Sequence, residues 1–328
     1  MTIQRRSFIK LGLIATAIAG LSASTAFAAN LKVALVLPGS VTDGGWNQGA
    51  YQGLEALKRD GYDVAFSENV SQANIPQVVR GYADDGYDLV IGHGFQFGSL
   101  FAEIGPDYPK QKFFATTSAP GGTKVPDNVM YVDFRYPEVA YGAGALAAFS
   151  SPKKSVGMVG GGDNPTTQAM AAAFKEGAAK EGVKANVIIT GDYNDAAKGR
   201  EAATTLTGNG ADVIWHTADL TGVGAVQGAA AAGAKVIGCF ADQTQLAPDA
   251  IITSFSSNNA GIVGAVAKMV KDGTFDGGKT WAPRLDFLWL TAAGDQAFNT
   301  KVADADATNK FKAVWSSLAD GKTKPASN

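Results

Sequence analysis

The sequence predicts an α/β protein with two lobes, each a doubly wound parallel sheet. Apolar strands alternate with helix-patterned segments at short spacing, which is typical of a parallel sheet covered on both faces. This alternation runs through residues 31–116 and starts again at residue 155. A chain of about 300 residues beyond position 28 is long enough for two packed cores. Ligands of such sheets bind beyond the carboxyl ends of the strands, so we expect a cleft between the lobes.

The first unit opens with a continuous apolar strand at 31–37. A helix is expected at 47–59, because Ala50, Leu54 and Leu57 recur at helical spacing and share one face. A second helix is expected at about 75–85, and further strands at 62–66, 88–92 and 112–116.

The second unit repeats this pattern, with a polar, proline-bearing gap at 150–152 as the boundary. A strand, a glycine turn and a helix are expected at 155–159, 160–162 and about 167–181, and further strands at 185–190, 213–216, 235–239 and 250–253. The helix at about 260–271 follows the last of these strands and is free to return to the first lobe. We therefore expect lobe 1 to comprise 29–150 and 256–282, and lobe 2 to comprise 151–255 and 283–328.

The first 28 residues have the pattern of a signal peptide. Arg5 and Arg6 precede an apolar run at 11–21, and a small-x-small cleavage pattern ends at Ala28. The paired arginines resemble a twin-arginine export signal, although a Sec signal peptide also requires a positively charged N-terminal region. The lone cysteine, Cys239, lies far from the cleavage site, so we expect a periplasmic protein rather than a lipoprotein.

Composition narrows the possible partners. The formal charge of −2 becomes −2 − 3 = −5 when Arg5, Arg6 and Lys10 are removed with the signal, so nothing favours nucleic acid as a partner. Beyond the signal no apolar stretch approaches the roughly 18 residues of a membrane span. His93 and His216 have no cysteine or spaced histidine partner, so neither a metal nor another cofactor is expected.

The most informative motif is the segment at 43–49, Asp-Gly-Gly-Trp-Asn-Gln-Gly, at the turn from the first strand into its helix. Trp46 offers a flat face to a planar ligand, and Asp43 and Asn47 offer donors and acceptors to its edge. Phe95 and Phe97 alternate around Gln96, and we place Phe95 in the pocket and Phe97 in the core. The other pocket candidates at strand ends are Thr117, Phe134, Tyr193, His216 and Asp242.

Four motifs in order, each at a strand end, resemble the basic membrane protein family of ABC-transporter solute-binding proteins. They are the segment at 43–49, Gly-His-Gly-Phe-Gln-Phe at 92–97, Asp-Tyr-Asn-Asp-Ala-Ala-Lys-Gly at 192–199 and Gly-Cys-Phe-Ala-Asp-Gln at 238–243. The resemblance runs from about residue 32 to 281. It implies a type I periplasmic-binding fold and a purine nucleoside or purine base as ligand.

The resemblance also implies roles for individual residues. Trp46 matches the aromatic that stacks on the base, Asp43 and Asn47 match the groups beside it, and Tyr193 matches an opposing ring. Asp242 matches an aspartate that holds sugar hydroxyls. Many members carry a lysine shortly after the strand end matching residues 253–254, where this chain has Phe-Ser-Ser-Asn-Asn, so a free base becomes a serious alternative to a nucleoside.

One motif points to a different function. Residues 273–280 fit the phosphate-loop pattern of nucleotide-binding proteins. A phosphate loop follows a strand and opens a helix, whereas this segment follows the predicted helix at 260–271. We therefore expect no nucleotide hydrolysis.

The sequence thus predicts a non-enzymatic, monomeric receptor that delivers a purine nucleoside or base to an ABC permease driven by a separate ATPase. The same fold with another planar heterocycle, such as a flavin or a pyrimidine, or with a sugar is the first alternative. A periplasmic nucleoside hydrolase using Asp43 and Asp242 is the second, and it lacks both a calcium-binding aspartate cluster and a nucleophile-base pair in the sequence.

Overall fold

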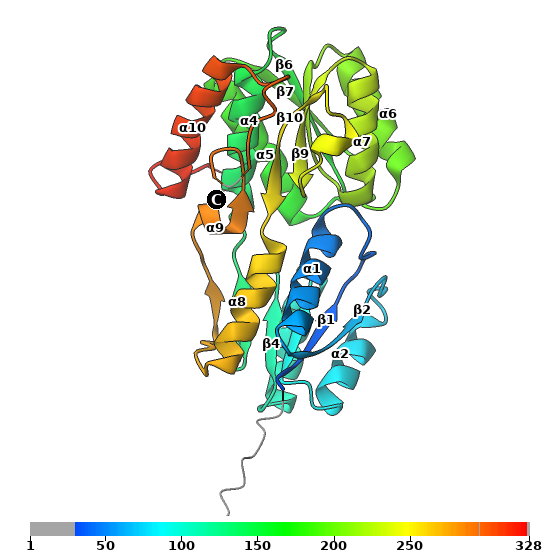
Figure 1. The fold of residues 1–328 in the computed structure, drawn as a ribbon, viewed down its shortest axis with the longest axis vertical. Helices are drawn as coiled ribbons and strands as arrows, with labels where there is room; N and C mark the ends of the chain where they lie inside the picture. The colour runs from blue at the N-terminus through cyan, green and yellow to red at the C-terminus, as the bar shows by residue number, and fades with distance from the viewer. Residues whose placement is uncertain (1–29, 295, 327–328) are drawn as a thin grey trace, which may run out of the picture.

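The computed structural model describes residues 30–294 and 296–326, so the predicted signal peptide lies outside the described part. These residues form two lobes, one above the other in Figure 1. Each lobe contains one six-stranded sheet, and the strand orders are β11-β5-β4-β3-β1-β2 and β12-β10-β9-β8-β6-β7. Pairing between neighbouring strands is parallel except between β10 and β12. The predicted two-lobed α/β fold is confirmed.

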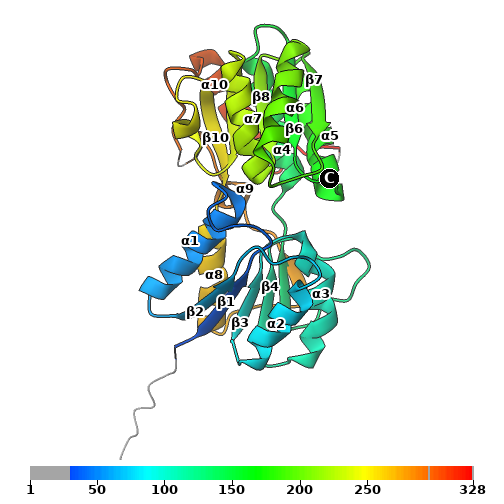
Figure 2. The same ribbon diagram turned by 90° about the vertical axis from the view of Figure 1, so that its right-hand side faces the viewer.

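The first lobe contains the first half of the chain and one returning segment. Its strands are β1 (Lys32–Val36), β2 (Asp63–Ser67), β3 (Leu89–Gly92), β4 (Lys112–Ala115), β5 (Val129–Val132) and β11 (Lys279–Trp281). Its helices are α1 (Trp46–Arg59), α2 (Ile75–Asp84), η1 (Phe95–Phe97), α3 (Gly98–Ile104), η2 (Gly105–Asp107) and α8 (Asn259–Lys271). In Figure 2, α1 and α8 lie on one face of this sheet and α2 and α3 on the other.

The second lobe repeats this architecture. Its strands are β6 (Ser155–Gly160), β7 (Lys184–Ile189), β8 (Val213–Thr217), β9 (Lys235–Phe240), β10 (Ile251–Ser257) and β12 (Trp289–Leu290). Its helices are α4 (Tyr136–Phe149), α5 (Pro165–Lys180), α6 (Ala196–Gly208), α7 (Asp219–Ala231), η3 (Thr244–Leu246), α9 (Leu285–Leu288) and α10 (Ala305–Ala319).

One hydrophobic cluster runs through both lobes, and each lobe has a second cluster on the other face of its sheet. In β1, Val33 and Leu35 join the cluster that contains α1 and α8, whereas Ala34 and Val36 join the cluster that contains α2 and α3. β1 is therefore buried on both faces, which explains its continuous apolar sequence.

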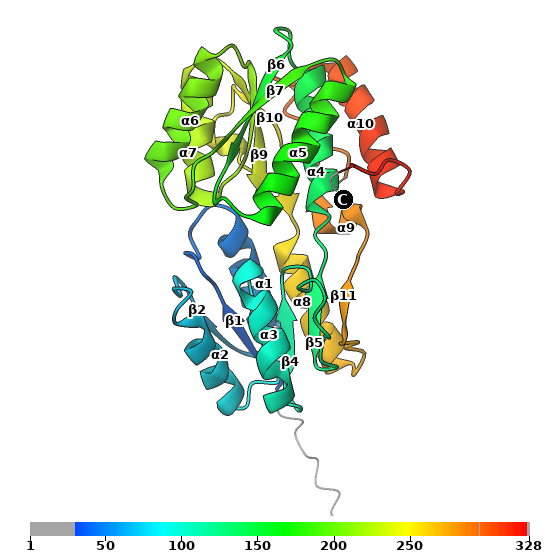
Figure 3. The same cartoon turned by 180° about the vertical axis from the view of Figure 1, so that it is seen from behind.

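The chain passes between the lobes in three places: from β5 to α4, from β10 to α8 and from β11 to α9 (Figure 3). At the first crossing, Arg135 adopts a left-handed backbone with φ 53°. Its Nε donates to Glu138 Oε1 at 3.0 Å, and its Nη2 donates to the Leu318 carbonyl at 3.0 Å. This ion pair fixes the start of α4 beside the crossing.

Two segments near the last crossings, β10 and residues 273–280, were the subject of sequence-based predictions. The strand expected to end at 253 continues to Ser257, because Ser254, Ser256 and Ser257 are buried with hydrogen-bonded hydroxyls. The segment at 273–280 follows α8 and leads into β11 instead of opening a helix. A phosphate loop instead follows a strand and opens a helix.

Candidate functional site

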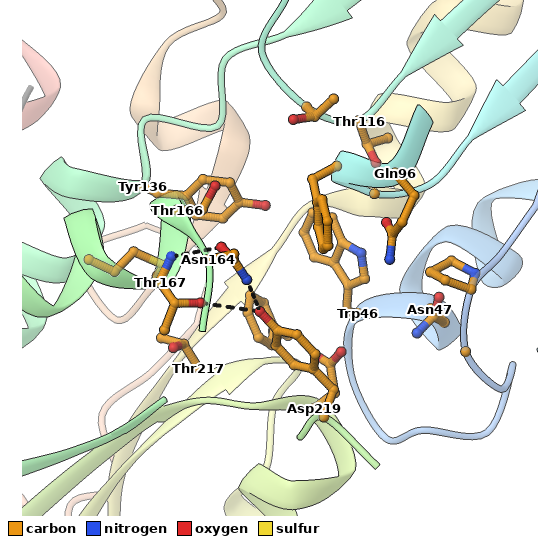
Figure 4. Close-up of a pocket in the computed structure, with 18 of the residues that line it drawn as sticks. Trp46, Asn47, Gln96, Thr116, Tyr136, Asn164, Thr166, Thr167, Thr217 and Asp219 are labelled. Carbon is orange, nitrogen blue, oxygen red and sulfur yellow. Dashed lines mark hydrogen bonds between the residues drawn. The ribbon is translucent and has the colours of Figure 1, made fainter. Parts of the chain in front are cut away.

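A cavity of about 190 Å³ lies between the lobes, at the carboxyl ends of strands from both sheets (Figure 4). The first lobe lines it with Pro38, Gly39, Trp46, Asn47, Gly94, Phe95, Gln96, Thr116 and Thr117. The second lobe and the crossing line it with Tyr136, Asn164, Thr166, Thr167, Met170, Tyr193, Asn194, Thr217, Asp219 and Phe240. Five of the predicted pocket residues therefore meet here: Trp46, Asn47, Phe95, Thr117 and Tyr193.

Trp46 is a fixed aromatic wall of the first lobe. One face of its indole stacks on His93, with ring centroids 4.4 Å apart and an angle of 19° between the planes. Its carbonyl accepts from His93 Nε2 at 2.9 Å and from Asn259 Nδ2 at 3.0 Å. Only 8% of the residue is exposed, so it combines a core position with a cavity-lining position.

Asp43 organises the turn before Trp46 instead of lining the cavity. Its carboxylate accepts from the backbone N–H groups of Gly45, Asn47 and Gln48 at 2.8–3.0 Å. Such acceptors satisfy free N–H groups at the start of a helix. The same carboxylate accepts from Asn47 Nδ2 at 2.8 Å. Asp43 thereby orients the Asn47 amide.

Two amide oxygens in the first lobe have no protein partner. Asn47 Oδ1 and Gln96 Oε1 are both buried without a hydrogen bond among the described residues. Both residues line the cavity, and Figure 4 shows them on the same side of it as Trp46. A buried acceptor left unpaired is costly, so these oxygens favour a ligand that brings N–H or O–H donors.

The two phenylalanines around Gln96 occupy different environments. Phe97 is fully buried in the core against α2 and α3. Phe95 is 50% exposed and lines the cavity.

Tyr193 forms the aromatic wall of the second lobe. A Cβ added at Gly161 or Gly162 would lie 2.3 Å or 2.6 Å from its ring, so only glycine lets the ring lie this close to the backbone. Asn164 Nδ2 donates to the Tyr193 hydroxyl at 2.8 Å, and Thr167 Oγ1 lies 3.2 Å from it. Figure 4 draws both interactions. The ring is thus held in one orientation before any ligand enters.

Asp219 places a carboxyl group in the cavity wall at the start of α7. Its backbone is left-handed, with φ 45°. The loop is tied to Tyr193, whose carbonyl accepts from the Thr221 N–H at 3.0 Å. Burial, and secondarily the Asp43 carboxylate, raises the pKa of Asp219 well above that of an ordinary aspartate. No hydrogen bond links this carboxyl to the rest of the described chain, so it is free to bind a ligand donor.

Tyr136 and Phe134 stand where the chain first crosses between the lobes. Their rings stack, with centroids 5.3 Å apart and an angle of 18° between the planes. Tyr136 lines the cavity, whereas Phe134 is buried behind Trp46, 5.0 Å from it between ring centroids. Phe134 therefore supports the indole instead of lining the cavity.

Both histidines are buried and neutral. Burial lowers the pKa of His93 to about 3 and that of His216 to about 4. His93 Nε2 carries the proton, because its partner, the Trp46 carbonyl, can only accept, and Nδ1 lies 3.0 Å from Thr116 Oγ1. His216 Nε2 lies 2.7 Å from Gln243 Oε1, and its ring packs under α7 beside Gly222, outside the cavity lining.

Asp242 lies in a second cavity. This space of about 500 Å³ adjoins the other side of α1 and is lined by polar groups that include Gln48, Gln243 and Ser257. Asp242 Oδ1 accepts from the Thr244 N–H at 3.0 Å and from the Thr244 hydroxyl at 2.7 Å. The structure therefore does not bring Asp242 together with Trp46 and Tyr193.

The sequence-based candidates omitted several residues that line the cavity. Gln96 lies in the motif at 92–97 and Asp219 lies three residues after His216, but Phe95 and His216 were the candidates at these two places. Asn164, Tyr136 and Phe240 were not candidates. Proximity to a glycine turn was the only available signal for Asn164.

Two sheet-bearing lobes with three crossings and a cavity between them define a type I solute-binding fold. Solved structures agree: the chain is similar to an ABC transporter solute-binding protein from Aeropyrum pernix K1, with TM-score 0.79 and 23% identity over 90% of this chain and 92% of that one. A solute-binding protein from Conexibacter woesei gives TM-score 0.70 and 26% identity over 90% and 98%.

The chain belongs to the Bmp family, described as ABC transporter substrate-binding protein PnrA-like, whose model matches residues 30–286. It is 28% identical to basic membrane protein A of Borreliella burgdorferi over 254 residues, 76% of this chain and 75% of that one. It is 26% identical to the ABC transporter nucleoside-binding protein BmpA of Lactococcus lactis over 274 residues, 76% and 77% of the two chains. The family identifies a substrate-binding protein of an ABC transporter, not an enzyme.

Such substrate-binding proteins act outside the cytoplasmic membrane. Across residues 30–294 and 296–326, no helix combines the length and the apolar character that a membrane crossing requires. The same residues contain no group of three or more side chains suited to holding a metal ion.

Proposed function

We propose that this protein binds a purine nucleoside or purine base in the interlobe cavity and delivers it to an ABC permease powered by a separate ATPase. The observation that carries the proposal is the pairing of two fixed aromatic walls, Trp46 and Tyr193, with acceptors that have no protein partner. The nucleoside-binding name of the Lactococcus lactis relative supports it.

The acceptors favour a ligand edge with N–H groups. Asn47 Oδ1 and Gln96 Oε1 lie in the first lobe, and the Asp219 carboxyl lies in the second. Adenine and guanine both carry an exocyclic amino group that donates two hydrogen bonds. We therefore expect an amino-bearing purine to bind more tightly than one without an amino group.

The aromatic walls set the scale of the affinity. Each base–ring stack contributes roughly 1 to 3 kcal/mol, and a micromolar complex corresponds to about −8 kcal/mol. Two stacks therefore supply a large part of a micromolar affinity, and the acceptors supply orientation. Because groups from both lobes contact the ligand, binding favours the closed arrangement of the lobes over the open one.

Three further features belong to this proposal. The chain is exported by the signal at 1–28 and works in the periplasm as a monomer. The expected division into 29–150 with 256–282 and 151–255 with 283–328 sets its first boundary one helix too late, because α4 (Tyr136–Phe149) packs against α5 and α10 of the second lobe. The membership of β11 in the first sheet and of β12 in the second supports the expected boundary at 282–283.

Isothermal titration of the mature chain tests the proposal. The panel consists of adenosine, guanosine, inosine, adenine, guanine and xanthine. We expect at least one of them to bind with a Kd of about 1 µM or tighter, because two base–ring stacks supply a large part of the binding free energy of a micromolar complex. Failure of all six to bind more tightly than about 1 mM, a free energy of only about −4 kcal/mol, would refute the purine assignment.

A further inference from the structure

Phe240 lines both cavities between the lobes. It is the last residue of β9 and appears in the wall of the 190 Å³ cavity and in that of the 500 Å³ cavity. Its ring centroid lies 5.4 Å from that of Trp46 and 6.1 Å from that of Trp289. Only 8% of the residue is exposed. Phe240 is therefore part of the wall that separates the two spaces.

The backbone at this position is strained. Phe240 has φ 67°, in the left-handed region that bulky residues rarely occupy. The strand holds it there: the Phe240 carbonyl accepts from Ser257 Oγ at 3.3 Å. A Cβ added at Gly45 would lie 3.2 Å from the Phe240 Cβ, so α1 begins tightly against this residue. Residues with strained backbones are common at ligand-binding sites, where the packing around them holds the strained conformation in place.

The wall decides what a bound purine can reach. A base placed between Trp46 and Tyr193 lies in the smaller cavity, while Asp242, the carboxylate that the sequence suggested for sugar hydroxyls, lies in the larger one. Phe240 stands between them. The smaller cavity is also below the roughly 300 to 1,000 Å³ of sites for drug-sized ligands.

We propose that Phe240 excludes the ribose and makes the site selective for a free purine base over the corresponding nucleoside. This inference rests on the proposed function, because it concerns the same cavity. Selectivity here comes from a steric barrier against the larger ligand instead of an additional contact to the smaller one.

The wild-type chain gives the first test. Titration against matched pairs, adenine with adenosine and guanine with guanosine, should show the base bound at least about 100-fold more tightly than its nucleoside. Equal affinities within a pair would overturn the inference and leave the proposed function standing. Absence of binding by every base and nucleoside would overturn both.

A glycine variant gives the second test. F240G removes the ring and suits the left-handed backbone, so its fold should persist, as a thermal melt can verify. We expect the preference for base over nucleoside to fall by about tenfold or more, because the barrier between the cavities is gone. F240L is the control, since it keeps an apolar side chain in the wall and should keep the preference. An unchanged preference in folded F240G, or an equal loss in F240L, would contradict the proposed barrier.

Discussion

Replacing Asp219 by asparagine tests the electrostatics of the cavity. The substitution keeps the shape of the side chain and removes its charge. The Asp219 carboxyl has no hydrogen-bond partner among the described residues and lines the cavity, so a bound purine would supply its donors. A hydrogen bond contributes about 0.5 to 1.5 kcal/mol and more when one partner is charged, so D219N should weaken binding by at least about 2- to 13-fold.

Stability should change in the opposite direction. Burial and the nearby Asp43 raise the pKa of Asp219 in the folded state above its unfolded value. The folded state therefore holds this proton more tightly, so the stability falls as the pH rises from the unfolded pKa of Asp219 through its raised folded pKa. D219N removes this ionisation and its cost, so its melting temperature at pH 7 should exceed that of the wild type. The gain should shrink as the pH falls and the wild-type carboxyl becomes protonated.

Calorimetric titration with the tightest-binding purine and a thermal melt at several pH values provide both quantities. D242N is the matched control, because Asp242 bonds only to Thr244 in the described structure and lies outside the smaller cavity. It should change the affinity for a base by less than about twofold, since no contact to the base is lost. Equal affinity of D219N and the wild type would refute the role assigned to this carboxyl.

Two further predictions concern Trp46 and His93. W46A should weaken binding of a stacked heterocycle by roughly 1 to 3 kcal/mol in a titration and, because the indole is also core, destabilise the fold by about 3 to 5 kcal/mol in denaturant unfolding. A ligand held by hydrogen bonds alone, away from the ring, would lose little affinity, and that result would count against stacking. His93 is neutral in the fold with a pKa of about 3, so its unfolded form takes up a proton first as the pH falls below 6.5. The contribution of His93 to the free energy of unfolding should therefore be fully present above pH 6.5 and decline by up to about 1.4 kcal/mol per pH unit below it. H93Q should show a shallower decline between pH 6 and 4, and parallel profiles for variant and wild type would contradict this assignment.

The fold was predictable because its signals are periodic. Continuous apolar strands and helices with one apolar face give the alternation, and the strand ends give the edge where ligands bind. Trp46, Asn47 and Tyr193 could be placed near one another on that basis. The return of α8 to the first lobe was also predictable, since it follows the last expected strand of the second.

The choice of residue within each strand-end cluster was less predictable. His216 and Asp219 are three positions apart, yet only Asp219 lines the cavity, because a left-handed residue at the start of α7 redirects the chain. Phe240 likewise owes its position to a left-handed backbone conformation, here at Phe240 itself. Such single dihedral angles leave no periodic pattern in a sequence. Asp43, conversely, looked suited to a ligand but satisfies the N–H groups at the start of α1.

In the proposed complex, a purine lies between Trp46 and Tyr193. A crystal structure of the chain with the tightest-binding member of the purine panel tests it most directly. We expect the base plane against both rings, with its N–H groups directed at Asn47 Oδ1, Gln96 Oε1 or the Asp219 carboxyl. A purine bound outside this cavity, or bound within it without contact to either ring, would contradict the account.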